Sequence, residues 1–245
     1  METRLNVYLA RTAGLSRRQA DKCIQEGKVS LNGNVVRQPF LRIKASDSVT
    51  FEGKLLAVRR QQYFIFHKPQ GVTTTRKDPF AAKTVMDFFP KQLSQLFPVG
   101  RLDKNSGGLL IMTNDGDLCH RVTHPKFAIE KEYRVTVNGI LKADDCRKAQ
   151  GGIYDNGDFL KVKSMIILKQ AKGITFCKVI VCEGKKRHIR RLFKQLGFTV
   201  RDLVRMRIGA LELKMLRAGE YREVSRNLLY EKVLFKLKKD KTMVG

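Results

Sequence analysis

The stretch VGRLDKNSGGLLIMTNDG, from Val99 to Gly116, decides how this chain is organised. Leu109 to Met112 form a continuous apolar run, which is typical of a buried strand. The residues before this run are flanked by glycine and include Arg101 and Asp103, and Asn114-Asp115-Gly116 after it predict a turn. If the chain is extended between Arg101 and Asp103, their side chains point to the same side. The stretch therefore predicts a cation and a carboxylate placed together on a loop that a buried strand holds.

Spacing alone leaves the role of Asp103 open. An aspartate near glycine and asparagine is most often a turn former, because its carboxylate accepts hydrogen bonds from the neighbouring backbone. A chemical role needs support from the rest of the chain.

The net charge is the strongest feature of the composition. Among 245 residues, Lys and Arg number 49 and Asp and Glu number 23, which gives +26. Such an excess indicates a polyanionic partner, since each phosphate that the protein neutralises releases counterions. The hydrophobic content of 42% allows a packed core, and the length allows a small domain beside a larger one.

Other features of the composition exclude several classes of protein. No apolar stretch is long enough to span a bilayer, and the basic residues are too scattered to form one membrane-binding helix. The five cysteines lack a CxxC pair, and Cys119, His120 and His124 lack a second pair of ligands, so we expect reduced thiols and no metal. With no secretory segment at the start, the expected location is the cytoplasm.

The N-terminal part predicts two short helices followed by a hairpin. The first helix spans Leu5 to Ala13 and ends at Gly14. The second opens at Ser16, with Gln19 three residues later in a capping-box pattern. Asn32-Gly33 between apolar residues predicts the hairpin turn.

This arrangement, over residues 2–60, resembles the S4 RNA-binding module. The second helix carries Arg17, Arg18 and Lys22, and the last two share a face because they lie four residues apart. These side chains either contact RNA or form an ordinary solvated face, and the net charge favours RNA.

Later segments predict the elements of a larger domain. Tyr63 to Phe66 indicates a buried strand, Thr84 to Phe89 a short helix and Asp117 to Thr123 another helix. Alternating patterns predict strands at 130–137, 159–168 and 174–181, with a helix at 143–150 and another after the basic segment that begins at Glu183.

Three separated motifs, together with the S4-like start, resemble the RsuA/RluB-type family of ribosomal RNA pseudouridine synthases. Gly100 to Asp103, with Ser106 in a hydroxyl position, matches the family's nucleophile motif. Lys131-x-Tyr133-x-Val135 matches the second motif, and Glu183 to Arg191 matches the third, with conservative departures at Lys185 and His188. The segment Lys68-Pro69-x-Gly71 also follows a family pattern. The resemblance covers nearly the whole chain.

The resemblance implies an α+β fold, with an S4 module at 2–60, a catalytic domain at 61–234 and a basic tail at 235–245. The sheet of the catalytic domain should be mixed and largely antiparallel. The implied reaction converts uridine to pseudouridine in ribosomal RNA. Since this isomerisation involves no net redox change, no cofactor is expected.

The resemblance also implies roles for site residues. Asp103 would be the nucleophile, Tyr133 would stack on the uracil, and Arg190 would pair with Asp103, which we expect to occur through two parallel hydrogen bonds. Arg101 would help to hold the target nucleotide out of its helix. The basic residues Lys186 and Arg187 would contact phosphate.

Some alternatives stay open at the level of sequence. The same scaffold could serve as a non-catalytic RNA-binding ribosome-assembly factor, although such a protein would be expected to lose Asp103, Tyr133 or Arg190. The C-terminal end and the Asn105-Ser106-Gly107 variant favour the large-subunit 23S RNA over the 16S RNA as substrate. We expect a monomer that acts on ribosomal RNA or a pre-ribosomal particle.

Overall fold

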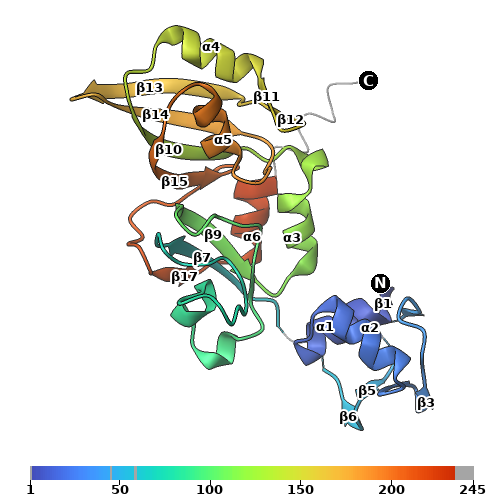
Figure 1. The fold of residues 1–245 in the computed structure, drawn as a ribbon. Coiled ribbons are helices and arrows are strands. Elements are labelled where there is room, and N and C mark those ends of the chain that lie inside the picture. Colours follow the sequence, from blue (N-terminus) through green and yellow to red (C-terminus); the bar gives the residue numbers. More distant parts are fainter. Residues whose placement is uncertain (1, 45, 58–59, 235–245) are drawn as a thin grey trace. The chain divides into compact units, whose positions relative to one another are not determined.

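The computed structural model describes residues 2–44, 46–57 and 60–234, and the chain divides into two compact units, Met1–Gln61 and Gln62–Gly245 (Figure 1). The tail predicted at 235–245 lies outside the described residues.

The first unit contains the two predicted helices and small antiparallel sheets. Its helices are α1 (Leu5–Ala13) and α2 (Arg17–Gln25). Its strands are β1 (Thr3–Arg4), β2 (Val29–Leu31), β3 (Asn34–Val35), β4 (Arg42–Ile43), β5 (Val49–Phe51) and β6 (Lys54–Leu55). Strand β1 pairs with β4, and the other strands form a sheet in the order β3-β2-β5-β6.

The local signals in this unit are confirmed. Gly14 adopts a left-handed conformation at the end of α1, and Ser16 and Gln19 form both hydrogen bonds of the capping box. Asn32 and Gly33 have φ angles of 50° and 87°, as a type I′ hairpin turn requires.

The second unit is built on one nine-stranded sheet. The main path of this sheet runs β13-β14-β10-β15-β9-β7-β17, with β16 beside β15 and β8 beside β9. The strands are β7 (Tyr63–Lys68), β8 (Phe97–Pro98), β9 (Gly107–Thr113), β10 (Lys131–Asn138), β13 (Ser164–Ala171), β14 (Ile174–Val181), β15 (Val200–Ile208), β16 (Leu211–Glu212) and β17 (Tyr221–Glu223). Among the described strands only β15 and β9 run parallel, so the predicted α+β fold with a mixed, largely antiparallel sheet is confirmed.

The parallel junction depends on glycine. Gly108 on β9 faces Arg205 on β15, and a Cβ atom at Gly108 would lie 2.3 Å from the backbone oxygen of Arg205. The φ angle of Gly108 is +106°, which side-chain-bearing residues rarely adopt. Glycine therefore lets two strands approach directly after the loop that carries Asp103.

Helices cover the two halves of this sheet (Figure 1). Helices α4 (Ala143–Gly151) and α5 (His188–Gln195) contribute to a core with β10, β13, β14 and β15. Helix α3 (Gly116–Thr123), helix α6 (Arg226–Leu229) and the π-helical turn η4 (Tyr230–Leu234) pack with β7, β9 and β15. The other face of β7 and β9 packs against the 3₁₀ turn η1 (Val85–Phe88); η2 (Lys91–Leu93) and η3 (Pro125–Phe127) are further 3₁₀ turns.

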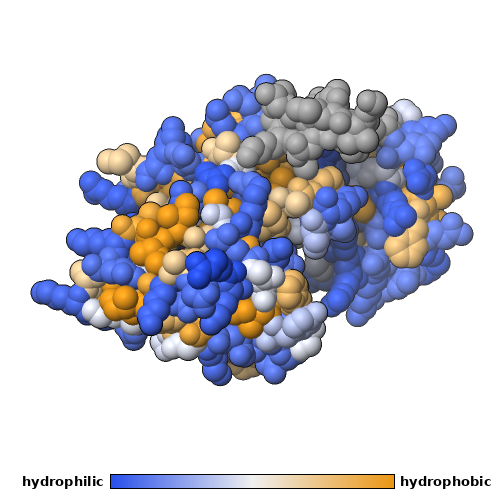
Figure 2. All heavy atoms as spheres, turned by 90° about the horizontal axis from the view of Figure 1, so that it is seen from above, coloured by the Kyte–Doolittle hydropathy of each residue, from blue (hydrophilic) through white to orange (hydrophobic). Residues whose placement is uncertain are grey.

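Strand β9 is consequently buried along its whole length, as its apolar run predicts. The outer surface is more hydrophilic than this buried strand. Hydrophilic side chains dominate the face in Figure 2, and hydrophobic patches interrupt them.

The strand predicted at 159–168 is wrong, because the chain forms two strands there. Strand β12 (Asp158–Leu160) pairs with β11 (Ile153–Asp155), and β13 begins only at Ser164. Between them the amide of Val162 donates to the carbonyl of Ala149 in α4, and the Val162 side chain is buried. Alternation continues through this break, which is why periodicity alone does not reveal it.

Two smaller predictions also need correction. The helix predicted at Thr84 to Phe89 is the 3₁₀ turn η1. The turn predicted at Asn114-Asp115-Gly116 is the start of α3, where the Asp115 carboxylate accepts hydrogen bonds from the amides of Asp117 and Leu118. A capping aspartate and a turn aspartate share the same local sequence preferences.

Candidate active site

The central motif lines a small cavity of about 90 Å³ in the second unit. Arg101 and Asp103 come from the loop before β9, and Tyr133 comes from β10. Glu183, Arg187 and other residues of the segment between β14 and α5 complete the walls. The structure therefore brings the first, second and third motifs of the sequence to one place.

The loop that carries Asp103 is fixed by its carbonyl groups, because each one from residue 102 to residue 106 accepts a hydrogen bond. The Thr74 hydroxyl donates to residue 102, and the Ser106 amide donates to residue 103. The Gly71 amide and Lys68 both donate to residue 104. Arg190 donates to residue 105, and Lys68 to residue 106. A loop held at every carbonyl has a fixed backbone, which sets the position from which the Asp103 side chain projects.

Lys68 is the central anchor of this loop. Its side chain is fully buried, and its Nζ donates to the carbonyls of Pro69 at 2.9 Å, Lys104 at 3.2 Å and Ser106 at 2.7 Å. Burial lowers the pKa of Lys68 to about 8, while the negative charge of Asp103 opposes this effect. The group is therefore an ammonium at neutral pH, with three donors for three acceptors.

Tyr133 occupies the middle of the sheet next to the Asp103 loop. Its strand β10 lies between β14 and β15, where Tyr133 faces Val179 on one side and Arg205 on the other. The side chain is 9% exposed and packs in the same core as Leu102. A ring held in this way can form a wall for a planar base.

The expected bidentate pair between Arg190 and Asp103 is not present among the described residues. The guanidinium instead donates to the carbonyl of Val200 at 3.0 Å and to that of Asn105 at 2.6 Å. One of its nitrogens thus ties α5 to β15, and another ties α5 to the Asp103 loop. The carboxylate still acts at longer range, since the charge of Asp103 raises the pKa of Arg190 against the larger lowering effect of burial.

The predicted RNA-binding residues fall into different places. Arg101 and Arg187 are exposed and line the cavity, whereas Lys186 is exposed but outside the lining. In the first unit, the three predicted side chains are exposed on α2: Arg17, Arg18 and Lys22.

Two residues of the cavity region were not recognised as functional from the sequence. His188 lines the cavity, is 5% exposed and lies with its Nδ1 3.7 Å from the Glu183 carboxylate. Burial lowers the pKa of His188, so its imidazole is neutral at pH 7. The second residue that was not recognised as functional is Lys68. Its place in a Lys-Pro-x-Gly segment was the signal that could have identified it.

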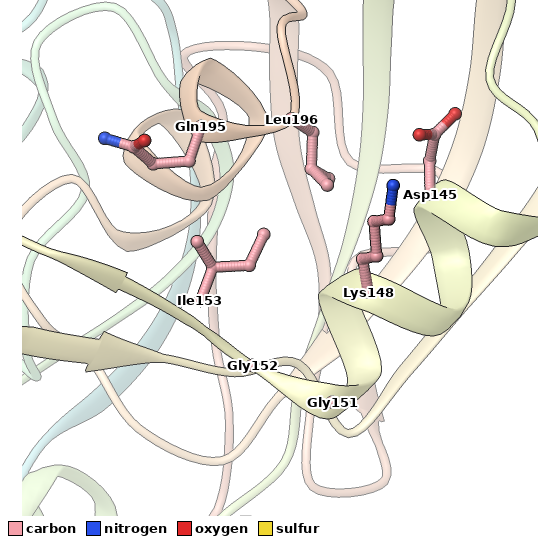
Figure 3. A pocket seen from close by; sticks show the side chains of 7 residues that line it. All are labelled: Asp145, Lys148, Gly151, Gly152, Ile153, Gln195 and Leu196. Atoms are coloured by element: carbon pink, nitrogen blue, oxygen red, sulfur yellow. The ribbon is translucent and has the colours of Figure 1, made fainter.

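A separate hollow of about 420 Å³ lies between α4 and α5 and contains none of the predicted site residues (Figure 3). Ile153 and Leu196 point into it, and Asp145 and Lys148 come from α4. The side-chain amide of Gln195 donates to the carboxylate of Asp155 at 2.6 Å, which gives Gln195 a structural role.

Two further properties concern the described part of the chain. None of its helices has the length and hydrophobicity needed to cross a membrane. Within the same residues, no group of three His, Cys, Asp or Glu side chains is arranged to hold a metal ion.

Comparison with known proteins identifies the same two parts. Residues 62–195 match the family model for RNA pseudouridylate synthase, and residues 3–49 match that for the S4 domain. The chain is 35% identical to ribosomal large subunit pseudouridine synthase B of Bacillus subtilis, over 91% of this chain and 92% of that protein. It is 34% identical to an RNA pseudouridine synthase of Rickettsia typhi, over 96% of both chains. A crystal structure of a pseudouridylate synthase superimposes with a TM-score of 0.68 at 32% identity, covering 94% of this chain and 98% of that one.

Proposed function

The chain belongs to the RNA pseudouridine synthase family, and from this premise we propose that it converts uridine to pseudouridine in ribosomal RNA, with the large-subunit RNA as substrate. The similarity to the large-subunit synthase of Bacillus subtilis along nearly the whole of both chains supports this choice. The 16S RNA is the alternative substrate.

The reaction needs a positioned carboxylate and a shaped pocket, and it balances without an external reagent. The N1–C1′ bond breaks, the uracil rotates, and a C5–C1′ bond forms. The proton leaves C5 and a proton binds N1, so no electrons are gained or lost. The enzyme has to bind the base, hold it during rotation and return it to the same ribose.

Asp103 is the nucleophile in this proposal, because it is the carboxylate of the cavity whose backbone is fixed at every neighbouring carbonyl. It either attacks C1′ of the ribose or removes a ribose proton on a glycal route. Both routes need an ionised carboxylate in a fixed position. Lys68 and Arg190 are the basic side chains that hold this position, since they donate to the carbonyls of residues 104 to 106.

Tyr133 and Arg101 act on the target nucleotide. The Tyr133 ring forms the wall on which the uracil lies, and its hydroxyl can take part in the late removal of the C5 proton. Arg101 reaches the cavity from an exposed position and can hold the nucleotide out of its helix. Arg190 positions the Asp103 loop through the carbonyl of Asn105.

The first unit and the charge of the chain supply RNA affinity. The S4 module presents Arg17, Arg18 and Lys22 to phosphate, and Lys186 and Arg187 add basic groups near the cavity. We propose that the protein acts as a monomer. We propose that the reaction takes place in the cytoplasm, on free RNA or on a pre-ribosomal particle.

The observation that carries the proposal is the shared cavity of Asp103 and Tyr133 beside a loop fixed at five consecutive carbonyls. The test is to map pseudouridine in ribosomal RNA from a strain that lacks the protein. We expect pseudouridine to be missing at a uridine of the 23S RNA and to be restored there by the purified full chain. Unchanged maps of both the 23S and the 16S RNA would refute the proposal.

A further inference from the structure

A groove of about 600 Å³ adjoins the cavity that holds Asp103. Its walls come from residues 125–128, from the end of β12 with the residues after it, and from the segment after β14. Glu183 and Lys185 line both the groove and the cavity, so the two hollows are neighbours. A groove of this size accommodates a ligand of several hundred daltons, such as a nucleotide.

Phe159 lines this groove, and its ring is held in place by its neighbours. Phe159 on β12 is 39% exposed, and its ring packs so closely on Gly152 that a Cβ atom there would lie 2.2 Å from it. The ring of Tyr154 on β11 lies beside it, with a centroid distance of 4.9 Å. The hairpin therefore presents Phe159 as a preformed apolar surface, which lowers the entropic cost of binding a planar group.

Lysines line the same groove as Phe159. Lys161, Lys163 and Lys185 line the groove together with the single acidic residue of its lining, Glu183. Lys185 Nζ donates to the carbonyl of Phe159 at 2.5 Å and thereby joins the aromatic wall to the segment that also borders the cavity. Lys161 is exposed and has no ion-pair partner in the described ranges, so its ammonium is available to an anion.

We propose that this groove binds the single-stranded nucleotide next to the target uridine, with its base on Phe159 and its phosphate at Lys161. The inference rests on the proposed function and adds a second nucleotide subsite to it. An aromatic platform bordered by lysines is suited to single-stranded RNA, because every base has a face that can stack and every nucleotide carries a phosphate. Extrusion of the target uridine separates its neighbour from one stacking partner, which Phe159 replaces.

The test pairs a variant of the protein with a change in the RNA. The full chain and Phe159→Ala are titrated with a short ribosomal RNA fragment that contains the target uridine, and with fragments that lack the base of one neighbouring nucleotide. We expect Phe159→Ala to bind the intact fragment at least fivefold more weakly, as loss of one stacked base predicts. On the fragment that is abasic at the correct neighbour, the two proteins should bind within twofold of each other.

Matched controls separate the subsite from general effects. Phe80→Ala removes a ring that is 96% exposed outside the groove, and this variant should keep the wild-type sensitivity to the abasic change. Phe159→Leu keeps apolar bulk without a π-face and should lose that sensitivity, even if the alanine variant folds poorly. Lys161→Gln should lower the slope of log affinity against log salt by about 0.7, the contribution of one phosphate on a single strand.

The inference is overturned if folded Phe159→Ala or Phe159→Leu loses affinity equally on intact and abasic fragments, or loses none. Failure of the proposed function would give a different result. The wild-type protein would then release no tritium from C5-labelled uridine in any ribosomal RNA fragment.

Discussion

The buried ammonium of Lys68 donates a 2.7 Å hydrogen bond to the carbonyl of Ser106, three residues after Asp103 in the same loop. A second bond from the same nitrogen reaches the carbonyl of Lys104. The side chain of Lys68 thus spans the turn that places the carboxylate, although it is not itself part of the cavity lining. Two predictions, one on turnover and one on the pH dependence of stability, depend on this anchor.

Lys68→Met should lower the turnover rate at saturating RNA by more than tenfold and reduce the free energy of unfolding by about 2 kcal/mol. Methionine fits the length of the site but leaves buried carbonyls without donors, and each such group costs about 1–3 kcal/mol. Single-turnover kinetics and urea unfolding measure the two effects. Lys104→Met is the control, because that side chain is exposed on the same loop and its replacement should leave stability unchanged. A wild-type turnover rate in Lys68→Met would contradict the role of Lys68 in positioning the Asp103 loop.

The lowered pKa of Lys68 predicts a pH dependence of stability. Its pKa is about 8 in the folded chain and near 10.5 in the unfolded chain, so the unfolded state binds more protons between these values. The free energy of unfolding contributed by this group should therefore rise as the pH increases from 8 to 10.5. The measurement is urea unfolding of the wild type and Lys68→Met at pH 7.5 and pH 10. The comparison cancels the parallel contribution of Lys131, whose pKa is also lowered to about 8. The lowered pKa of Lys68 would be contradicted if the difference in free energy of unfolding between the wild type and Lys68→Met were the same at both pH values, or changed in the opposite direction.

Arg190→Lys should reduce the turnover rate at saturating RNA although the charge is kept. The planar guanidinium reaches the carbonyls of Asn105 and Val200 at once, and an ammonium cannot reproduce that fork. Arg201→Lys, at an exposed arginine on the neighbouring strand, is the matched control. If Arg190 instead only contacts phosphate, Arg190→Lys would keep wild-type turnover and bind RNA more weakly, with a smaller salt dependence.

Replacing Arg17, Arg18 and Lys22 together by glutamine in the full chain should weaken RNA binding more than it affects chemistry. These side chains are exposed on α2, far along the sequence from the motifs that line the cavity. Phosphate contacts position a protein on RNA without taking part in the reaction. The slope of log affinity against log salt should fall by about 2, as loss of three phosphate contacts predicts. Unchanged affinity with reduced turnover at saturation would contradict this division of roles.

Sequence patterns predict the fold well where the signal is local. The capping box at Ser16, the hairpin at Asn32-Gly33 and the buried strand after Asp103 depend on neighbours within a few residues. The hairpin of β11 and β12 carried a signal of the same kind at Asn156-Gly157, where both φ angles are positive, but the alternation at 159–168 obscured it.

The site is less accessible to sequence reasoning, because its contacts join distant segments. The Lys-Pro-x-Gly segment marks Lys68 as a family position, but it does not indicate that the side chain turns inward to carbonyls almost forty residues later, since a lysine at a strand end is usually exposed. The hydrogen-bond partners of Arg190 also depend on how α5 packs. Its guanidinium donates to the carbonyls of Val200 and Asn105, whereas the sequence predicted that it donates to Asp103. The sequence motifs therefore predict which residues lie close together, whereas the hydrogen bonds between their atoms depend on the tertiary structure.

The most direct test of the account is the activity of Asp103→Asn, measured as tritium release from C5-labelled uridine in the ribosomal RNA substrate at saturating protein. The substitution is nearly isosteric, so the fold and the RNA affinity should stay as in the wild type, while the nucleophile is lost. We predict no detectable tritium release from this folded, RNA-binding variant. Release within about tenfold of the wild-type rate, equivalent to roughly 1.4 kcal/mol in the barrier, would contradict the assignment of Asp103 as the nucleophile.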